Sequence, residues 1–285
     1  MTGSLEQVTV YTPDDRRGGV LRTALHSFRE TWRYRALVWT LFSRDFRAQF
    51  KQSILGYFWT VLGPVLGVFS FVFMNYMGIL HPGATVVPYP LYAFVGTSVW
   101  GFLMNSIGNM SGGLNAHAEL IMRTNIPKIV LVGSALANIA YGILVNLILI
   151  VLFMAALRVP FGWSSLAFPF LTLPLIVLGT GIGLAVSVVG IVAKDITRLV
   201  SQFFSLMMFL TPVFYVADQI PSRLMRRLIM DNPLTYLVEV PRDMLLGQPV
   251  PYWSQYGATS AGCLLVFLVG IKIFDLVQDL VAERL

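Results

Sequence analysis

The chain has 285 residues, of which 56% are hydrophobic and only 12% are charged, with a formal charge of +6. Soluble domains carry about 25% charged residues, and the single cysteine, Cys263, allows no intrachain disulfide framework. These values exclude a soluble enzyme, a disordered chain and a secreted disulfide scaffold, and they predict an all-α membrane protein. In so apolar a chain the excess of Lys and Arg marks cytoplasmic loops and lipid headgroups, so we expect no nucleic-acid partner.

The first 32 residues are polar and basic and lack the apolar core of a cleavable signal peptide, so we expect a cytoplasmic tail over 1–32. The segment 33–52 predicts an amphipathic helix, because its apolar side chains fall within about 120° of arc and its basic side chains lie opposite. The apolar set is Val38, Trp39, Phe42, Phe46 and Phe50, and the basic set is Arg33, Arg44, Arg47 and Lys51.

An aromatic face opposite a basic face is typical of a helix that lies in the membrane interface. The alternative is a cytoplasmic helix packed on its own protein. We favour the interfacial position because the segment leads directly into the first apolar span.

Long charge-free runs follow, and apolar runs of about 18 residues or more predict membrane-spanning helices. The longest run, Gln52–Ala118, is interrupted by turn residues at His81-Pro82-Gly83 and Pro88-Tyr89-Pro90, so it holds two spans. Residues 53–285 therefore predict a six-span transmembrane domain, with spans at Leu55–Leu80, Leu91–Met110, Ile129–Ala156, Leu166–Val192, Leu199–Tyr215 and Gln255–Phe274. The second span is rich in Gly, Ser, Thr and Asn, which let helix backbones approach closely in lipid.

With a cytoplasmic N-terminus, 15 of the 20 Lys and Arg residues fall on the inner side. The positive-inside rule then places both termini in the cytoplasm and the segment 217–247 outside. Ile220-Pro221-Ser222 favours the start of a short helix, and Asn232-Pro233 favours its end. We therefore expect two short outer helices of re-entrant type before the last span.

The sequence contains no G-x-x-x-x-G-K-[ST] phosphate loop and no H-E-x-x-H zinc motif. The expected spans contain no Asp or Glu, the residues that ion-coupled carriers usually place near mid-membrane. We therefore expect no catalytic residue, metal site or cofactor in this chain. A pore-forming or scaffold subunit, powered by another protein if at all, fits the pattern.

Four motifs, in order along the chain, resemble those of one family. The motif Arg44-Asp45-Phe46-Arg47-x-x-Phe50-Lys51-Gln52-Ser53-x-Leu55-Gly56-x-x-Trp59 is similar to the start of polysaccharide-export ABC transporter permeases, the Wzm and teichoic-acid-exporter group of the ABC-2 superfamily. Two cytoplasmic loops of that group resemble Leu120-Ile121-x-Arg123-x-Asn125-x-Pro127 and Lys194-Asp195-Ile196. The segment before their last span resembles Asn232-Pro233-Leu234-Thr235-Tyr236-x-x-Glu239-x-x-Arg242, from which Pro241 departs.

The resemblance implies a homodimer in the bacterial inner membrane that binds two copies of a separate ABC ATPase, which holds the ATP and Mg²⁺. It implies export of a lipid-linked polysaccharide of O-antigen, galactan or teichoic-acid type. The loop with Glu119, Arg123 and Asn125 is then a coupling helix that contacts the ATPase. The alternative is a plain cytoplasmic turn, in which Glu119 and Arg123 form an i, i+4 pair.

The resemblance also implies that the first and fifth spans of both copies line a channel. A sugar polymer has hydroxyl edges and apolar C–H faces, so its conduit suits aromatic side chains without strong charge. The candidate lining residues are Phe58, Phe69, Phe73 and Tyr76 of the first span and Phe203 and Phe204 of the fifth. The alternative is that these rings face lipid or pack against other helices.

A lipid-linked polysaccharide of this class carries a phosphate or pyrophosphate at headgroup depth. Arg44, Arg47 and Lys51 share one face of the amphipathic helix just before the first span. Arg binds phosphate oxygens through a planar fork and Lys adds a point charge, so these residues are candidates to bind that anion. The alternative is that they only anchor the helix to anionic lipids.

Three other functions stay open. An ABC-2 exporter of drugs or small lipids usually has larger outer loops and often a fused ATPase. An intramembrane glycan-processing enzyme would need clustered Asp, Glu or His near the interface, whereas Asp45, Glu119 and Asp195 each lie beside a basic residue in a family motif. A structural scaffold would need no ATPase.

Overall fold

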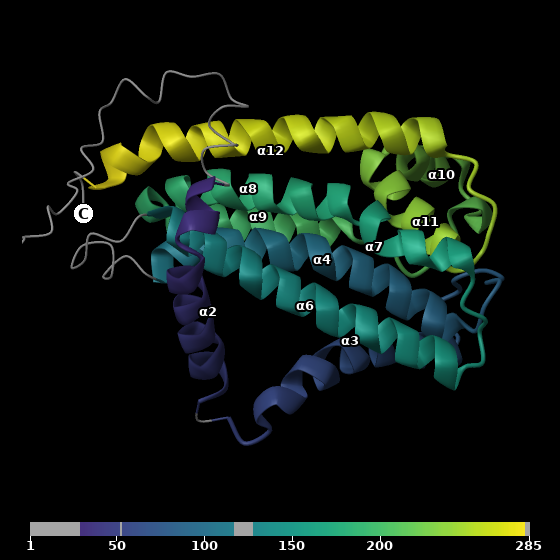
Figure 1. The fold of residues 1–285 in the computed structure, drawn as a ribbon. Coiled ribbons are helices and arrows are strands. Elements are labelled where there is room, and N and C mark those ends of the chain that lie inside the picture. The colour runs from purple at the N-terminus through teal and green to yellow at the C-terminus, as the bar shows by residue number, and fades with distance from the viewer. Residues whose placement is uncertain (1–28, 52, 117–127, 283–285) are drawn as a thin grey trace, which may run out of the picture.

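The computed structural model describes residues 29–51, 53–116 and 128–282. Over these ranges every regular element is a helix, which confirms the all-α prediction. Six helices run along one bundle (Figure 1). They are α3 (Trp59–Tyr76), α4 (Tyr89–Ala116), α6 (Lys128–Ala156), α8 (Leu173–Val192), α9 (Lys194–Met207) and α12 (Trp253–Ala282).

Four helical stretches within the described ranges are long and apolar enough to cross a membrane. They are Gly56–Tyr76, Ile129–Ala156, Trp163–Gly190 and Trp253–Leu276, and they correspond to the first, third, fourth and sixth expected spans. The fourth stretch joins α8 to the short helices η3 (Trp163–Ala167) and α7 (Phe168–Leu171). Of the other two, α4 is long, at 28 residues, but more polar, and α9 has only 14 residues.

The central helix of the bundle is α4, which packs against α3, α6 and α8. Most of its residues from Leu91 to Ile107 are buried by protein, and the others are partly buried. One polar contact crosses to α6, where the Ser98 hydroxyl donates to Asn146 Oδ1 at 3.3 Å. A helix enclosed by protein does not need an apolar surface, which explains how a sequence rich in Ser, Thr and Asn occupies this position.

The most extensive packing joins α8 to α4 on one face and to α12 on another. The α8–α12 contact depends on a pair of glycines. A Cβ atom on Gly181 would lie 2.5 Å from the Cα of Phe267, and one on Gly270 would overlap the carbonyl oxygen of Gly181. Small residues therefore set the closest approach between these two helices.

Helix α2 (Arg35–Phe50) confirms the predicted helix before the first span, and it runs across the direction of the long helices (Figure 1). Leu41 and Phe42 are buried, and the Phe46 ring meets Tyr141 of α6 edge-on at 4.6 Å. Trp39, by contrast, is 66% exposed. The apolar face thus packs partly on the protein and stays partly uncovered, and the interfacial position of the helix stays a prediction.

The fifth expected span is displaced along the chain. Helix α9 begins at Lys194 and ends at Met207, and turns follow as far as Tyr215. The helix tolerates charge at its start because Asp195 in the first turn interacts favourably with the helix dipole. Pro212 lacks an N–H and disfavours helical geometry in the residue before it, so the helix does not continue to Tyr215.

The segment before α12 forms two short helices, as predicted: α10 (Arg223–Asp231) and α11 (Pro233–Leu245). The Ser222 hydroxyl accepts from the Met225 N–H at 3.4 Å and caps α10. The Asn232 side chain accepts from the Leu234 N–H at 3.1 Å and caps α11, whose first residue is Pro233. Both helices lie at the end of the bundle opposite α2, while the C-terminal end of α12 lies at the α2 end (Figure 1).

Gly270→Ala should destabilise the α8–α12 pair, because the new Cβ meets a backbone oxygen that cannot rotate away. Overpacking of this kind costs roughly 1–3 kcal/mol and should lower the melting temperature of the detergent-purified protein. The matched control is Gly262→Ala on the same helix, where an added Cβ meets open space. Equal melting temperatures for the two variants would contradict this packing.

Candidate functional site

An open pocket of about 820 Å³ lies where α2 meets the start of α3. Three cationic side chains border it, and aromatic rings form much of the rest. The lining residues are Trp39, Thr40, Ser43, Arg44, Arg47, Ala48, Phe50, Lys51, Gly56 and Tyr57. This α2–α3 pocket therefore brings together all three residues that the sequence analysis assigned to the substrate phosphate.

The turn that closes the pocket depends on Gly56. Its φ of +49° lies in the left-handed region that favours glycine, and its N–H donates to the Ser53 hydroxyl at 3.1 Å. This turn carries the chain into η2 (Gly56–Phe58) and places the Tyr57 ring 4.7 Å from Phe50 and 5.5 Å from Phe46. The rings hold the start of the first span against α2.

The three cations of the pocket differ in their partners. Arg44 donates from Nε and Nη2 to Asp45 Oδ1, at 3.1 and 2.9 Å, so part of its charge is compensated. Arg47 and Lys51 are exposed, and neither makes an ion pair with another described residue. The open positive charge of the pocket therefore comes mainly from Arg47 and Lys51.

The predicted aromatic residues of the first span form an exposed row. Their exposed fractions are 56% for Phe58, 61% for Phe69, 47% for Phe73 and 84% for Tyr76. The side of α3 that turns inward carries Phe71, which stacks on Phe214 at 4.4 Å. The exposed rings are therefore distinct from those that hold α3 to the bundle.

The two predicted residues of α9 face different surroundings. Phe203 is 54% exposed, whereas Phe204 is half-buried and packs against the main hydrophobic core. Phe203 therefore resembles the exposed row of α3, and Phe204 contributes at least as much to packing. The predicted coupling residues, Glu119, Arg123 and Asn125, lie outside the described residues, and their role stays a prediction.

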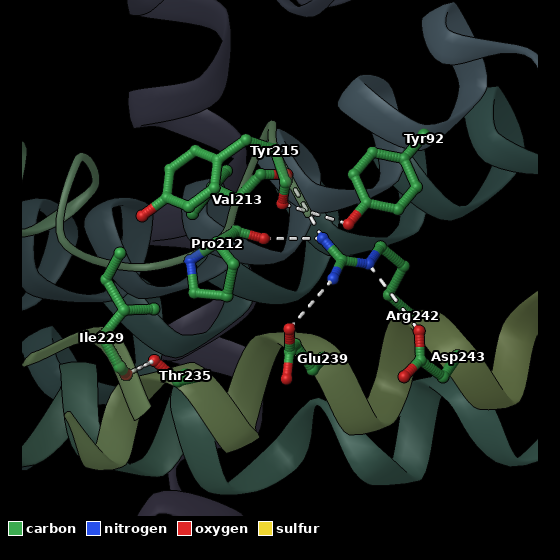
Figure 2. Close-up of polar contacts among 9 residues, drawn as sticks. All are labelled: Tyr92, Pro212, Val213, Tyr215, Ile229, Thr235, Glu239, Arg242 and Asp243. Atoms are coloured by element: carbon green, nitrogen blue, oxygen red, sulfur yellow. Dashed lines mark hydrogen bonds and ion pairs between the residues drawn. The ribbon is translucent and has the colours of Figure 1, made fainter. Parts of the chain in front are cut away.

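The sequence analysis missed a polar cluster around Arg242 of α11 (Figure 2). The residue is only 2% exposed. Its Nη1 donates to the carbonyl oxygen of Pro212 at 2.6 Å and lies 3.5 Å from that of Val213. Nη2 lies 3.8 Å from Glu239 Oε1, and Nε lies 3.9 Å from Asp243 Oδ1.

Two further side chains hold the same stretch of backbone. The amide of Asn232 donates to the carbonyl of Leu210 at 3.1 Å and to the Thr211 hydroxyl at 3.0 Å. The Tyr92 hydroxyl donates to the carbonyl of Tyr215 at 3.1 Å, and the Tyr92 ring lies under the Arg242 guanidinium, 4.1 Å from its carbon. We call these three residues, Tyr92, Asn232 and Arg242, the carbonyl clamp.

Burial dominates the electrostatics of this cluster. It raises the pKa of Glu239 to about 7, although the nearby Arg242 guanidinium acts in the opposite direction. Burial likewise raises the pKa of Asp243, again against the effect of Arg242. The Arg242 charge is thus shared between two carboxyl groups that are both costly to ionise.

The sequence did contain a signal for this cluster. Arg242 ends the motif before the last span, with Glu239 three residues earlier and Asp243 directly after it, so acids flank this Arg on both sides. The neighbouring side chains of Val238 and Val240 are apolar and fully buried. A charged trio in an apolar helix of this kind indicates a buried polar network rather than a solvated face.

A family model described as ABC-2 type transporter matches residues 36–246. The chain belongs to the ABC-2 type transporter family. The match begins in α2 and ends just after α11, so this membership covers both the α2–α3 pocket and the carbonyl clamp. It confirms the resemblance that the four motifs indicated.

Similar proteins of known name are O-antigen export system permease proteins RfbA. The one from Myxococcus xanthus is 24% identical over 259 residues, which cover 90% of this chain and 98% of the relative. One from Klebsiella pneumoniae is 25% identical over 247 residues, which cover 85% of this chain and 92% of the relative. The similarity therefore extends over nearly the full length of these permeases.

Proposed function

We propose that this chain is the membrane-spanning permease subunit of an ATP-driven exporter that moves lipid-linked polysaccharide across the bacterial inner membrane. The observation that carries the proposal is the α2–α3 pocket, where cations and aromatic rings meet beside the first apolar span. A phosphate with an apolar lipid on one side and a sugar on the other matches that combination of surfaces. The O-antigen export named for the relatives supports the same substrate class.

Six spans with both termini in the cytoplasm agree with the path of the chain. The α2 end of the bundle is then cytoplasmic, and the α10–α11 end is external. Although α4 is polar, it is enclosed by α3, α6 and α8, so it can cross the membrane inside the protein. The turns from Met208 to Tyr215 extend the short α9 toward the outer side.

The power source in this proposal is a separate ABC ATPase, two copies of which bind a dimer of this chain and hold the ATP and Mg²⁺. Residues 117–127 connect α4 to α6, and the described ends of these two helices lie near α2 (Figure 1). Glu119, Arg123 and Asn125 of that segment are therefore our candidates for the contact that couples ATP hydrolysis to the permease.

The conduit in this proposal is lined by the exposed aromatic row of α3 together with Phe203 of α9. In a single chain these rings are largely exposed, with exposed fractions of 61% for Phe69 and 54% for Phe203. A second copy facing them would enclose a passage with aromatic walls. Such walls offer contact to the C–H faces of sugars without a charge that would trap them.

The cationic side of the α2–α3 pocket binds the phosphate that links sugar and lipid. Arg47 and Lys51 supply positive charge that no described residue compensates, whereas Arg44 forms an ion pair with Asp45. In this proposal the charge lies at headgroup depth, because α2 directly precedes the first apolar span, Gly56–Tyr76. Arg47 is the stronger candidate for a bidentate contact.

Deleting the gene for this chain should leave the polysaccharide synthesised but confined to the cytoplasmic leaflet, because in this proposal the chain forms its route across the membrane. The measurement is the amount of polymer at the cell surface, detected with a lectin, against the total extracted with lipid. Re-expression of the wild-type chain should restore surface polymer. A wild-type level of surface polymer in the deletion strain would show that the chain serves another cargo or function.

Arg47→Lys keeps the charge but removes the planar fork, so it should slow export and lower substrate-stimulated ATP hydrolysis by roughly tenfold, as expected for a lost charge-assisted hydrogen bond. Basal ATP hydrolysis should not change. The matched control is Arg35→Lys at the exposed start of α2, which does not line the pocket. If Arg47→Lys and Arg35→Lys export alike, Arg47 only anchors the helix.

A further inference from the structure

The chain leaves helical geometry directly after α9, at the end of the bundle where α10 and α11 lie. In the turns that follow, carbonyl groups accept hydrogen bonds from side chains: Leu210 from Asn232, Pro212 from Arg242 and Tyr215 from Tyr92. Irregular backbone in a membrane protein needs such internal donors, because lipid offers none. The position of this segment therefore depends on the carbonyl clamp.

The three donors come from different elements. Tyr92 lies in α4, Arg242 lies in α11, and Asn232 lies between α10 and α11. The clamp thus ties the end of α9 to the central helix and to the outer helices at once. The segment also closes on itself, because the Tyr215 hydroxyl donates to the Phe209 carbonyl at 2.9 Å.

The clamped turns continue the exposed apolar row of α9. That row begins with Leu199, Phe203 and Leu206 on the helix and ends with Phe209 and Leu210 on the turns, which are 59% and 41% exposed. The clamp therefore fixes the part of the row that lies nearest the outer end of the bundle.

The contacts of Arg242 with its two acidic neighbours are long. Nε has no hydrogen-bond partner, and the nearest oxygens of Glu239 and Asp243 stand at 3.8 and 3.9 Å from the guanidinium. An apolar side chain of similar volume generally packs at lower cost than a buried charge. Unlike an apolar side chain, Arg242 reaches the backbone carbonyls of Pro212 and Val213 and so fixes the position of the turn.

We propose that Arg242 is a positioning residue that holds the turns after α9 in place and keeps the outer mouth of the conduit narrow between transport events. The outer mouth is the region of Phe209 and Leu210 on each copy. The inference rests on the proposed function, because it assumes that α9 lines a passage. When the clamp weakens, these residues move and the mouth widens.

The test measures passive leak through the assembled transporter. Proteoliposomes that contain this chain with its ATPase, without ATP, are loaded with a small anionic fluorescent dye, and its release is followed. Arg242→Met removes the carbonyl donors and should raise the leak roughly tenfold. Arg242→Lys keeps one donor and the charge, so its leak should fall between those of Arg242→Met and the wild type.

If Arg242→Met does not fold, the milder variant Tyr92→Phe still tests the proposal. Tyr92→Phe removes only the hydroxyl that donates to Tyr215 and keeps the ring under Arg242, so it too should leak more than the wild type. The control is Arg226→Lys in α10, an exposed Arg that donates to the Ile220 carbonyl at 2.8 Å, and it should leak like the wild type. All variants are compared at equal yield of the intact complex by size exclusion.

Assembled Tyr92→Phe and Arg242→Lys complexes that are as tight as the wild type would overturn the proposal. Leak in the Arg226→Lys control equal to that of Arg242→Lys would overturn it as well. The assay contains no polysaccharide, so its outcome is independent of the substrate class. A deletion strain with normal surface polymer would refute the proposed function, whereas tight clamp variants would refute only the role of Arg242.

Discussion

Polar groups inside a membrane protein have to be satisfied by the protein itself, and this constraint shapes the whole bundle. It permits α4 to carry Ser, Thr and Asn because α3, α6 and α8 enclose it. It also requires that the turns after α9 find donors within the chain, which Arg242 and Asn232 provide. The apolar helices then pack around these polar elements, with Gly181 and Gly270 setting how closely α8 and α12 approach.

The same constraint separates the two ends of the molecule. At the α2 end, Arg47 and Lys51 remain exposed beside aromatic rings, so the charge there is available to an external anion. At the opposite end, Arg242 is buried and donates to backbone carbonyl groups. The exposed cations of the α2–α3 pocket therefore suit binding, and the buried Arg242 suits positioning. This division agrees with an exporter that collects its substrate on one side of a membrane and releases it on the other.

The sequence predicted those features that depend on composition over many residues. Long apolar runs predicted the four candidate spans. The placement of aromatic and basic residues on opposite faces of one helix predicted α2. Local capping chemistry located α10 and α11, because Ser222 and Asn232 act within a few residues of their own position. The three cations of the pocket followed from helical periodicity, since residues 44, 47 and 51 share one helix face.

Features that depend on contacts between distant segments could not be predicted in this way. The charge-free run continues through Thr211 and Pro212, so it favoured a span as far as Tyr215 although Pro212 disfavours helix in the residue before it, and α9 in fact ends at Met207. Glu239 and Asp243 flank Arg242 in the sequence, but the backbone carbonyls that it contacts, those of Pro212 and Val213, lie some thirty residues earlier in the chain, and no local pattern identifies them. Phe203 and Phe204 are adjacent on α9, but Phe204 faces the hydrophobic core and Phe203 faces outward. The side of α9 that packs on the core depends on the rest of the bundle.

The most direct test of the conduit is capture of the polymer during transport. A photoreactive phenylalanine analogue is placed at Phe69 or Phe203, and the complex is illuminated while it hydrolyses ATP in the presence of lipid-linked polysaccharide. The control position is Leu265 of α12, which is 64% exposed and lies outside the proposed passage. The account predicts sugar cross-linked to the chain from Phe69 and Phe203 and none from Leu265. Equal capture at all three positions, or capture at Leu265 alone, would contradict it.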